Sequence, residues 1–191
     1  NVAQAGDGQA VGLATTATAT SSTTNIAQSD VTFQTDEASA TSFTVDASTP
    51  FAIDLFTTEN SDTVAATITV TGGALTIDET ATMLAQTSAT VYTMTIASGA
   101  EVLLGGAAVV NSNGTFNVEL QGGTFTAQEA DTQAIAFNFD SDSDGDGILK
   151  ALGADVKSFA GTVGATNGLA SITIGSATDD AGADFAEAVT A

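Results

Sequence analysis

Short segments in which apolar and polar residues alternate recur along most of the chain, and no other feature constrains its fold as strongly. Alternation with a period of two places every second side chain on one face, as in a half-buried β-strand. Threonine is frequent in these segments, and its β-branched side chain suits a pleated strand better than a helix. The pattern therefore predicts an all-β protein. The clearest segments are 51–55, 68–70, 75–77, 92–96, 116–120, 135–139 and 172–174.

Turn residues between these segments indicate how the strands connect. Gly72-Gly73 separates two alternating segments, and Asn113-Gly114 separates two more, so both dipeptides favour tight hairpins. Many short strands joined in this way are typical of an antiparallel β-sandwich or jelly roll. A β-solenoid is the alternative, but no fixed repeat of roughly 20–50 residues is present. We therefore predict the antiparallel sandwich, with short helical turns near 148–159 and 180–189.

The first part of the chain differs from the rest in composition. Residues 1–24 contain no aromatic residue and one charged residue, Asp7. This segment is either the first strand of its own domain or a donor strand that adds to the sheet of a neighbouring subunit. We predict an extended segment at 1–24, followed by a single β-sandwich domain at 25–191.

The charge balance excludes several functions. The chain has 23 acidic residues and only two lysines or arginines, which gives a formal net charge of −21. Nucleic-acid binding requires phosphate neutralisation by basic residues, so it is excluded. An anionic membrane surface is disfavoured for the same reason, and no apolar run is long enough to be inserted across a bilayer.

Catalysis also has little support in the sequence. Histidine and cysteine are absent, so Ser-His-Asp and Cys-His sites cannot form. A pair of carboxylates could hydrolyse glycosides, but the chain has no tryptophan and one tyrosine to form a sugar platform. We therefore predict that the protein is not an enzyme. Because the sequence begins at Asn1 without a signal-peptide core, we interpret the chain as the processed form of a secreted protein.

The segment 140–149, DSDSDGDGIL, is the one local motif that indicates a specific chemistry. Carboxylates two residues apart can converge on one hard cation, and glycine permits the turn that directs the next carbonyl inward. In the better register the ligands are Asp142, Asp144 and Asp146, with the backbone carbonyl of Ile148. The motif therefore predicts a calcium site.

This segment resembles the calcium loops of EF-hand and dockerin modules and the Asp-rich loops of thrombospondin type 3 repeats. It departs from an EF-hand at the twelfth position, which is Gly153 instead of glutamate, and at the ninth, which is Lys150. Asp140, Asp155, another loop or water would then complete the site. The resemblance implies calcium binding of the weaker extracellular class, roughly 10⁻⁴–10⁻³ M. The complete predicted ligand set is Asp140, Asp142, Asp144, Asp146, Ile148 and Asp155.

In overall composition the chain is similar to prokaryotic surface-layer proteins and extracellular filament subunits. That similarity implies a secreted structural protein at the cell surface that self-assembles and is stabilised by calcium. Its partners would be copies of itself, joined by strand exchange or by calcium-bridged contacts. The alternative function is a calcium-dependent adhesin or carbohydrate-binding module.

Overall fold

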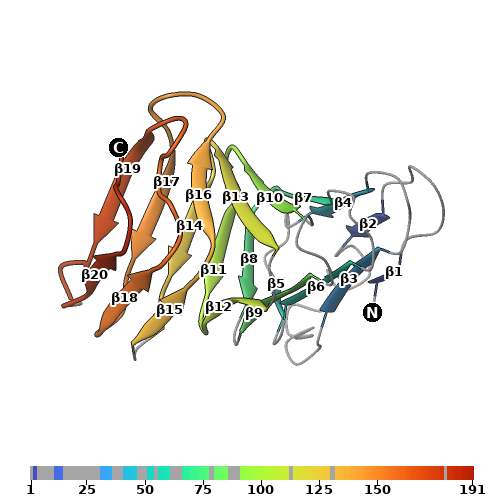
Figure 1. The fold of residues 1–191 in the computed structure, drawn as a ribbon, viewed down its shortest axis with the longest axis horizontal. Helices are drawn as coiled ribbons and strands as arrows, with labels where there is room; N and C mark the ends of the chain where they lie inside the picture. The colour runs from blue at the N-terminus through green and yellow to red at the C-terminus, as the bar shows by residue number, and fades with distance from the viewer. Residues whose placement is uncertain are drawn as a thin grey trace.

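The protein is a parallel β-solenoid made of three sheets (Figure 1). In this computed structural model, every pairing between two named strands is parallel, and the sheets wind around one long axis. The sheets contain eight, six and six strands, and we call them A, B and C. The structure describes residues 2–3, 11–14, 31–35, 41–46, 51–53, 56–60, 66–77, 80–85, 91–111, 114–129, 132–178 and 180–191.

In all three sheets the strands follow one another along the solenoid in the order of the chain. Sheet A consists of β1 (Val2–Ala3), β3 (Val31–Thr35), β6 (Phe56–Asn60), β9 (Ala81–Ala85), β12 (Ala108–Asn111), β15 (Gln133–Ile135), β18 (Val156–Phe159) and β20 (Gly182–Phe185). Sheet B consists of β2 (Val11–Ala14), β4 (Thr41–Asp46), β7 (Ala66–Thr71), β10 (Val91–Ala97), β13 (Thr115–Gln121) and β16 (Asn138–Ser141). Sheet C consists of β5 (Phe51–Ile53), β8 (Ala74–Ile77), β11 (Glu101–Leu104), β14 (Thr124–Ala127), β17 (Asp146–Ala151) and β19 (Leu169–Ile174).

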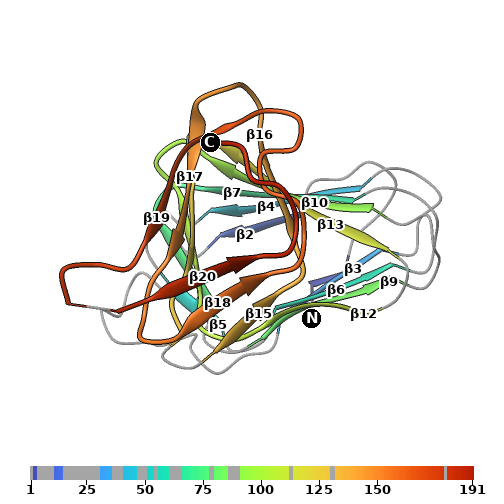
Figure 2. The same ribbon diagram turned by 60° about the vertical axis from the view of Figure 1, so that its left-hand side comes forward.

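The chain visits the three sheets in turn, and one such circuit is a coil. β9, β10 and β11 form one coil, and β12, β13 and β14 form the next. Strands that follow one another in the chain therefore lie in different sheets, and each strand pairs with the strands one coil before and after it. Figure 2 shows the three sheets on different sides of the coil.

The predicted antiparallel β-sandwich or jelly roll is therefore wrong. Period-two alternation shows that one face of a strand is buried, but it does not show the direction of the neighbouring strand. The turn at Gly72-Gly73 is a corner between β7 of sheet B and β8 of sheet C, and Gly72 has a φ of 90°. Asn113 lies outside the described residues, but β12 and β13, on either side of it, also belong to different sheets.

The predicted helical turns are also wrong. Described residues near 148–159 form β17 and β18, and those near 180–189 include β20. The number of residues in a coil varies, and this variation explains why the sequence shows no fixed period. Ile68 pairs with Met94, 26 residues later, but Val118 pairs with Phe139, only 21 residues later. A repeat of such variable length does not stand out as a repeat.

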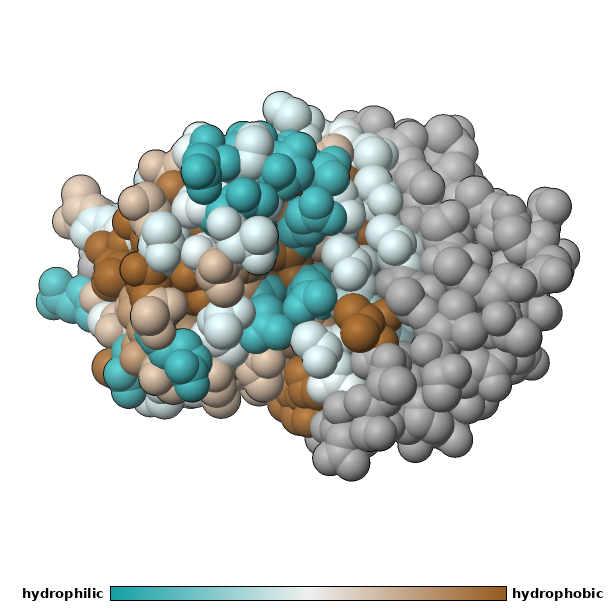
Figure 3. All heavy atoms as spheres, turned by 45° about the horizontal axis from the view of Figure 1, so that its top comes forward, coloured by the Kyte–Doolittle hydropathy of each residue, from teal (hydrophilic) through white to brown (hydrophobic). Residues whose placement is uncertain are grey.

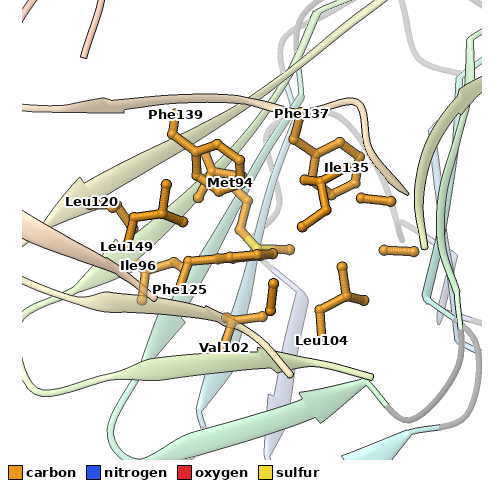
Figure 4. Close-up of a cluster of buried hydrophobic side chains, with 14 of the residues drawn as sticks. Met94, Ile96, Val102, Leu104, Leu120, Phe125, Ile135, Phe137, Phe139 and Leu149 are labelled. Atoms are coloured by element: carbon orange, nitrogen blue, oxygen red, sulfur yellow. The ribbon is translucent and has the colours of Figure 1, made fainter. Parts of the chain in front are cut away.

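The core consists of ladders of apolar side chains that continue from coil to coil. On sheet B one ladder contains Met94, Val118 and Phe139, none more than 1% exposed. Figure 4 shows Met94 and Phe139 among side chains of the other sheets. The ring of Phe139 packs edge-on against Phe125 of sheet C and against Phe159 of sheet A. The distances between ring centroids are 4.9 Å and 5.9 Å, respectively. Because Phe139 contacts residues from both other sheets, it joins all three sides of the coil.

Replacing Phe139 by alanine should destabilise the protein by about 3–5 kcal/mol, because the loss of a large side chain would leave a cavity among fixed neighbours. Phe185→Ala is the matched control, since Phe185 stacks on Phe159 at 5.0 Å but lies half-buried in the last coil. Chemical denaturation should show a clearly smaller loss for the control. Equal losses would contradict the packing described for the core.

Candidate functional site

The aspartate-rich segment forms the corner between sheets B and C, at the top of Figure 1. Asp140 lies in β16, and Asp146 is the first residue of β17. Asp142 and Asp144 are exposed in the loop between these strands. The sequence therefore correctly located a turn rich in carboxylates, and the contacts of each carboxylate show what the turn does.

Asp140 accepts hydrogen bonds from three backbone amides, two of which belong to the next coil. Its Oδ1 accepts hydrogen bonds from the N–H of Asn167 at 2.8 Å and of Ser141 at 3.0 Å. Its Oδ2 accepts from the N–H of Thr166 at 3.0 Å. Hydrogen bonds from backbone N–H groups to a carboxylate are charge-assisted and stronger than neutral ones. Asp140 therefore fastens the segment 162–168, which we call the wall loop, against sheet B.

The rest of the corner strengthens the same connection. Asp144 Oδ1 accepts from the N–H of Gly168 at 3.0 Å, and Ser141 Oγ donates to the carbonyl of Gly168 at 3.0 Å. Asp146 Oδ1 accepts from the N–H of Gly147 at 2.9 Å. A Cβ added to Gly147, which has a φ of 70°, would collide with Leu120 of β13. Gly147 therefore permits close packing between sheets B and C.

The two remaining predicted ligands are the backbone carbonyl of Ile148 and the side chain of Asp155. Ile148 is inside β17, where its N–H donates to the carbonyl of Gly123 at 3.0 Å. Asp155 is exposed beyond the other end of β17, and a six-residue strand spans about 20 Å. The structure brings Asp140 and Asp144 to the wall loop, but it does not bring Asp155 to either of them.

The described residues do not fit a calcium cage in this arrangement. Within the ranges that the structure describes, no three acidic side chains lie close enough together to hold a metal ion. Calcium needs six to eight converging oxygen ligands, whereas the oxygens of Asp140 and Asp144 accept from backbone amides. Calcium binding stays a prediction, and it would require several of these carboxylates to turn toward the ion.

Both lysines follow the aspartate run in sequence, but their described contacts lie elsewhere. Lys150 Nζ lies 3.4 Å from Glu101 Oε1 on the outer side of sheet C. Thr126 Oγ1 donates to the same carboxylate oxygen at 2.7 Å. Lys157 is fully buried in β18, and its Nζ donates to the backbone carbonyl of Asp155 at 3.0 Å.

Beside the aspartate corner, the outer side of sheet B carries a groove of about 420 Å³. Side chains from three successive strands form its floor, and the wall loop forms one side. Hydrophilic residues gather on this side of the molecule in Figure 3. The polar residues of the floor are Thr93 of β10, Asn117 and Glu119 of β13, and Asn138 and Asp140 of β16.

Hydrogen bonds hold the floor and the wall of this groove together. Asn138 Nδ2 donates to Asn117 Oδ1 at 3.1 Å, and Asn138 Oδ1 accepts from the N–H of Thr162 at 3.0 Å. Glu119 and Asn117 are absent from the predicted site residues, because only the coil-to-coil register brings them beside Asp140 and Asn138. In the sequence, Asn117 and Glu119 stand out only as polar residues that alternate with apolar ones in the segment 116–120.

Asp140→Ala should lower the free energy of unfolding by about 1–3 kcal/mol without calcium, because three backbone N–H groups lose their charged acceptor. Asp142→Ala is the matched control in the same loop, since Asp142 accepts one long hydrogen bond, of 3.5 Å, from Ser143. Thermal and urea unfolding in a chelating buffer would measure both variants. Similar stability of the two variants would contradict the anchoring role of Asp140.

Calcium binding can be tested separately from this structural role. If the loop binds calcium, millimolar calcium should raise the melting temperature of the wild-type protein, and Asp142→Asn should remove most of that increase. Without calcium the two proteins should melt alike, since Asp142 contributes little to the loop itself. The prediction of calcium binding is wrong if calcium leaves the melting temperature of the wild-type protein unchanged and calorimetry detects no heat of binding.

Within the described part of the chain, no helix is long and apolar enough to cross a membrane. Comparison of the chain with protein-family models, with curated proteins and with solved structures finds no match.

Proposed function

We propose that the protein is an extracellular structural subunit whose copies stack end to end into a filament or surface layer. The observation that carries this proposal is the open core at the last coil. Ile174 pairs with Ala151 and continues a buried ladder of sheet C, yet its side chain is 48% exposed. Val189 continues the ladder of Phe139 and Val163 on the sheet B side, and it is 40% exposed.

Exposed core positions at a coil end indicate a surface that another coil can cover. At this end of the described structure, β19 and β20 are the last strands of sheets C and A. Within the described structure, no further named strand pairs with their outward edges, and such an edge can recruit another strand.

The polarity of the sheets favours head-to-tail stacking. At the opposite end of the solenoid, β1, β2 and β5 are the first strands of sheets A, B and C. All strands of a sheet run in the same direction, so a second copy can add to the last coil as another coil would. A head-to-tail contact of this kind is not self-complementary, and it generates open filaments.

The charge of the chain opposes this assembly and makes it dependent on salt. A net charge of −21 repels neighbouring copies. At physiological ionic strength the Debye length is about 8 Å, so exposed charges on stacked coils are partly screened. Calcium would relieve the same repulsion, which supports a role for calcium in assembly even without a cage in one subunit.

Strand donation by residues 1–24 is the other route by which copies can join. In the structure, the described parts of this segment pair within the chain, β1 with β3 and β2 with β4. A donor strand would exchange these pairings for the same pairings on a neighbour.

The alternative function, an adhesin or carbohydrate-binding module, is favoured by one observation, the polar groove on sheet B.

The stacking proposal predicts that charges at the open core block assembly. At high salt and high protein concentration the wild-type protein should form filaments, whereas the double variant Ile174→Asp with Val189→Asp should stay monomeric. The matched control is Ser171→Asp with Thr173→Asp, which adds the same charge on the other face of β19, where these residues pair with Ile148 and Lys150 and not with the core ladder of Ile174. Light scattering and negative-stain electron microscopy would follow both variants.

Two outcomes would contradict stacking: a wild-type chain that stays monomeric under all these conditions, or a core variant that assembles like the control. Deleting residues 1–24 separates the two routes. Strand donation requires that this deletion abolish assembly, whereas edge stacking should survive it, since β3, β4 and β5 would still present strand edges.

A further inference from the structure

Three polar side chains in the groove on sheet B have hydrogen-bonding capacity that the described residues leave unused. The carboxylate of Glu119 is half-buried, and within the described part of the chain it has no hydrogen bond or ion pair. Asn117 accepts a hydrogen bond through Oδ1, but no described residue accepts from its NH₂ group. The hydroxyl of Thr93 likewise makes no hydrogen bond in this part of the structure.

The sheet fixes the spacing of these groups. Thr93 and Asn117 are register partners on neighbouring strands, which places them about 5 Å apart. Asn117 and Glu119 are alternate residues of β13, so they point to the same face about 7 Å apart. The groups therefore form a triangle on the floor of the groove. Glu119 is an acceptor, the NH₂ of Asn117 is a donor, and the hydroxyl of Thr93 can be either.

We propose that this groove binds a neutral saccharide. Each hydroxyl of a sugar both donates and accepts hydrogen bonds, and adjacent hydroxyls are separated by a few ångströms. Glu119 accepts hydrogen bonds from sugar hydroxyls, Asn117 donates to sugar oxygens, and Thr93 does either. A volume of about 420 Å³ lies within the range of small-ligand sites, which is about 300–1,000 Å³.

The composition of the groove disfavours other ligand classes. Anions are repelled by Glu119 and by the overall charge of −21. A purely apolar ligand would take the carboxylate of Glu119, the amide of Asn117 and the hydroxyl of Thr93 away from water without offering them hydrogen bonds, which is unfavourable. Among the described residues a metal ion lacks a set of converging acids, and Asp140, the neighbour of Glu119, already accepts from three N–H groups.

The groove is formed before a ligand arrives. Thr162 is held by Asn138, and Thr166 and Asn167 are held by Asp140. Binding therefore does not require the wall loop to become ordered, so less of the interaction energy is lost. The inference goes beyond end-to-end assembly, because the groove lies on the side of the solenoid and does not involve the core positions exposed at its end.

Nuclear magnetic resonance titration of the full chain with maltose, cellobiose, lactose and N,N′-diacetylchitobiose, each at millimolar concentration, tests the proposal. At least one disaccharide should cause saturable shifts in the side-chain amide of Asn117 and in the backbone amides of β13 and the wall loop. Glu119→Gln should weaken that binding about tenfold or more, because a charged acceptor becomes a neutral amide. Asn117→Ala is a second variant that removes the donor without changing the charge.

Asp184→Asn is the matched control, because it removes one charge at an exposed position of sheet A and should leave binding unchanged. Melting temperatures would confirm that each variant is folded. The proposal is overturned if no disaccharide causes saturable shifts in the groove, or if both groove variants bind as tightly as the wild-type protein. It is also overturned if calcium chloride or spermidine shifts the groove signals and the sugars do not.

Discussion

The stacking of each coil on the next, strand parallel to strand and in register, is the interaction on which the whole structure depends. The inner face of a single coil is apolar and has no partner within that coil, so it is buried only when neighbouring coils cover it. Met94, Val118 and Phe139 follow one another in this way, and each is essentially inaccessible to solvent. The core is therefore a column of contacts between coils, and almost all of its stabilising burial depends on residues more than twenty positions apart.

The same register governs the outer surface, where it has a different consequence. Equivalent positions of successive coils lie side by side, so Glu119 lies next to Asp140 in a chain that is already strongly acidic. Like charges directly beside each other are destabilising. Backbone N–H groups of the next coil offset this repulsion at Asp140. Acidic residues in this region thus hold the coils together as well as making the surface negative.

The sequence was sufficient to predict strands but not their arrangement. Segments 92–96 and 116–120 fall within β10 and β13, because alternation reports burial of one face directly. Strand direction leaves no such trace. The separation between paired residues of successive coils varies from 21 residues, between Val118 and Phe139, to 32, between Val11 and Phe43, and this variation hides the repeat. Glycines with positive φ at Gly72, Gly99 and Gly122 mark the same corner of three successive coils, and their recurrence was the available signal for a solenoid. The aspartate corner was visible because it is local, whereas its partners at 166–168 and the groove around Glu119 depend on register alone.

The core ladders end at the exposed residues Ile174 and Val189, and this has a consequence for how such a molecule can change in length. Each coil touches only the coils on either side of it, so a complete coil can be added or removed without disturbing residues more than one coil away. Three sheets and an apolar interior define the cross-section of the molecule and leave its length open. Growth of one chain by duplication of a coil and growth of a filament by addition of a subunit are then the same structural step, differing only in whether a peptide bond connects the two coils.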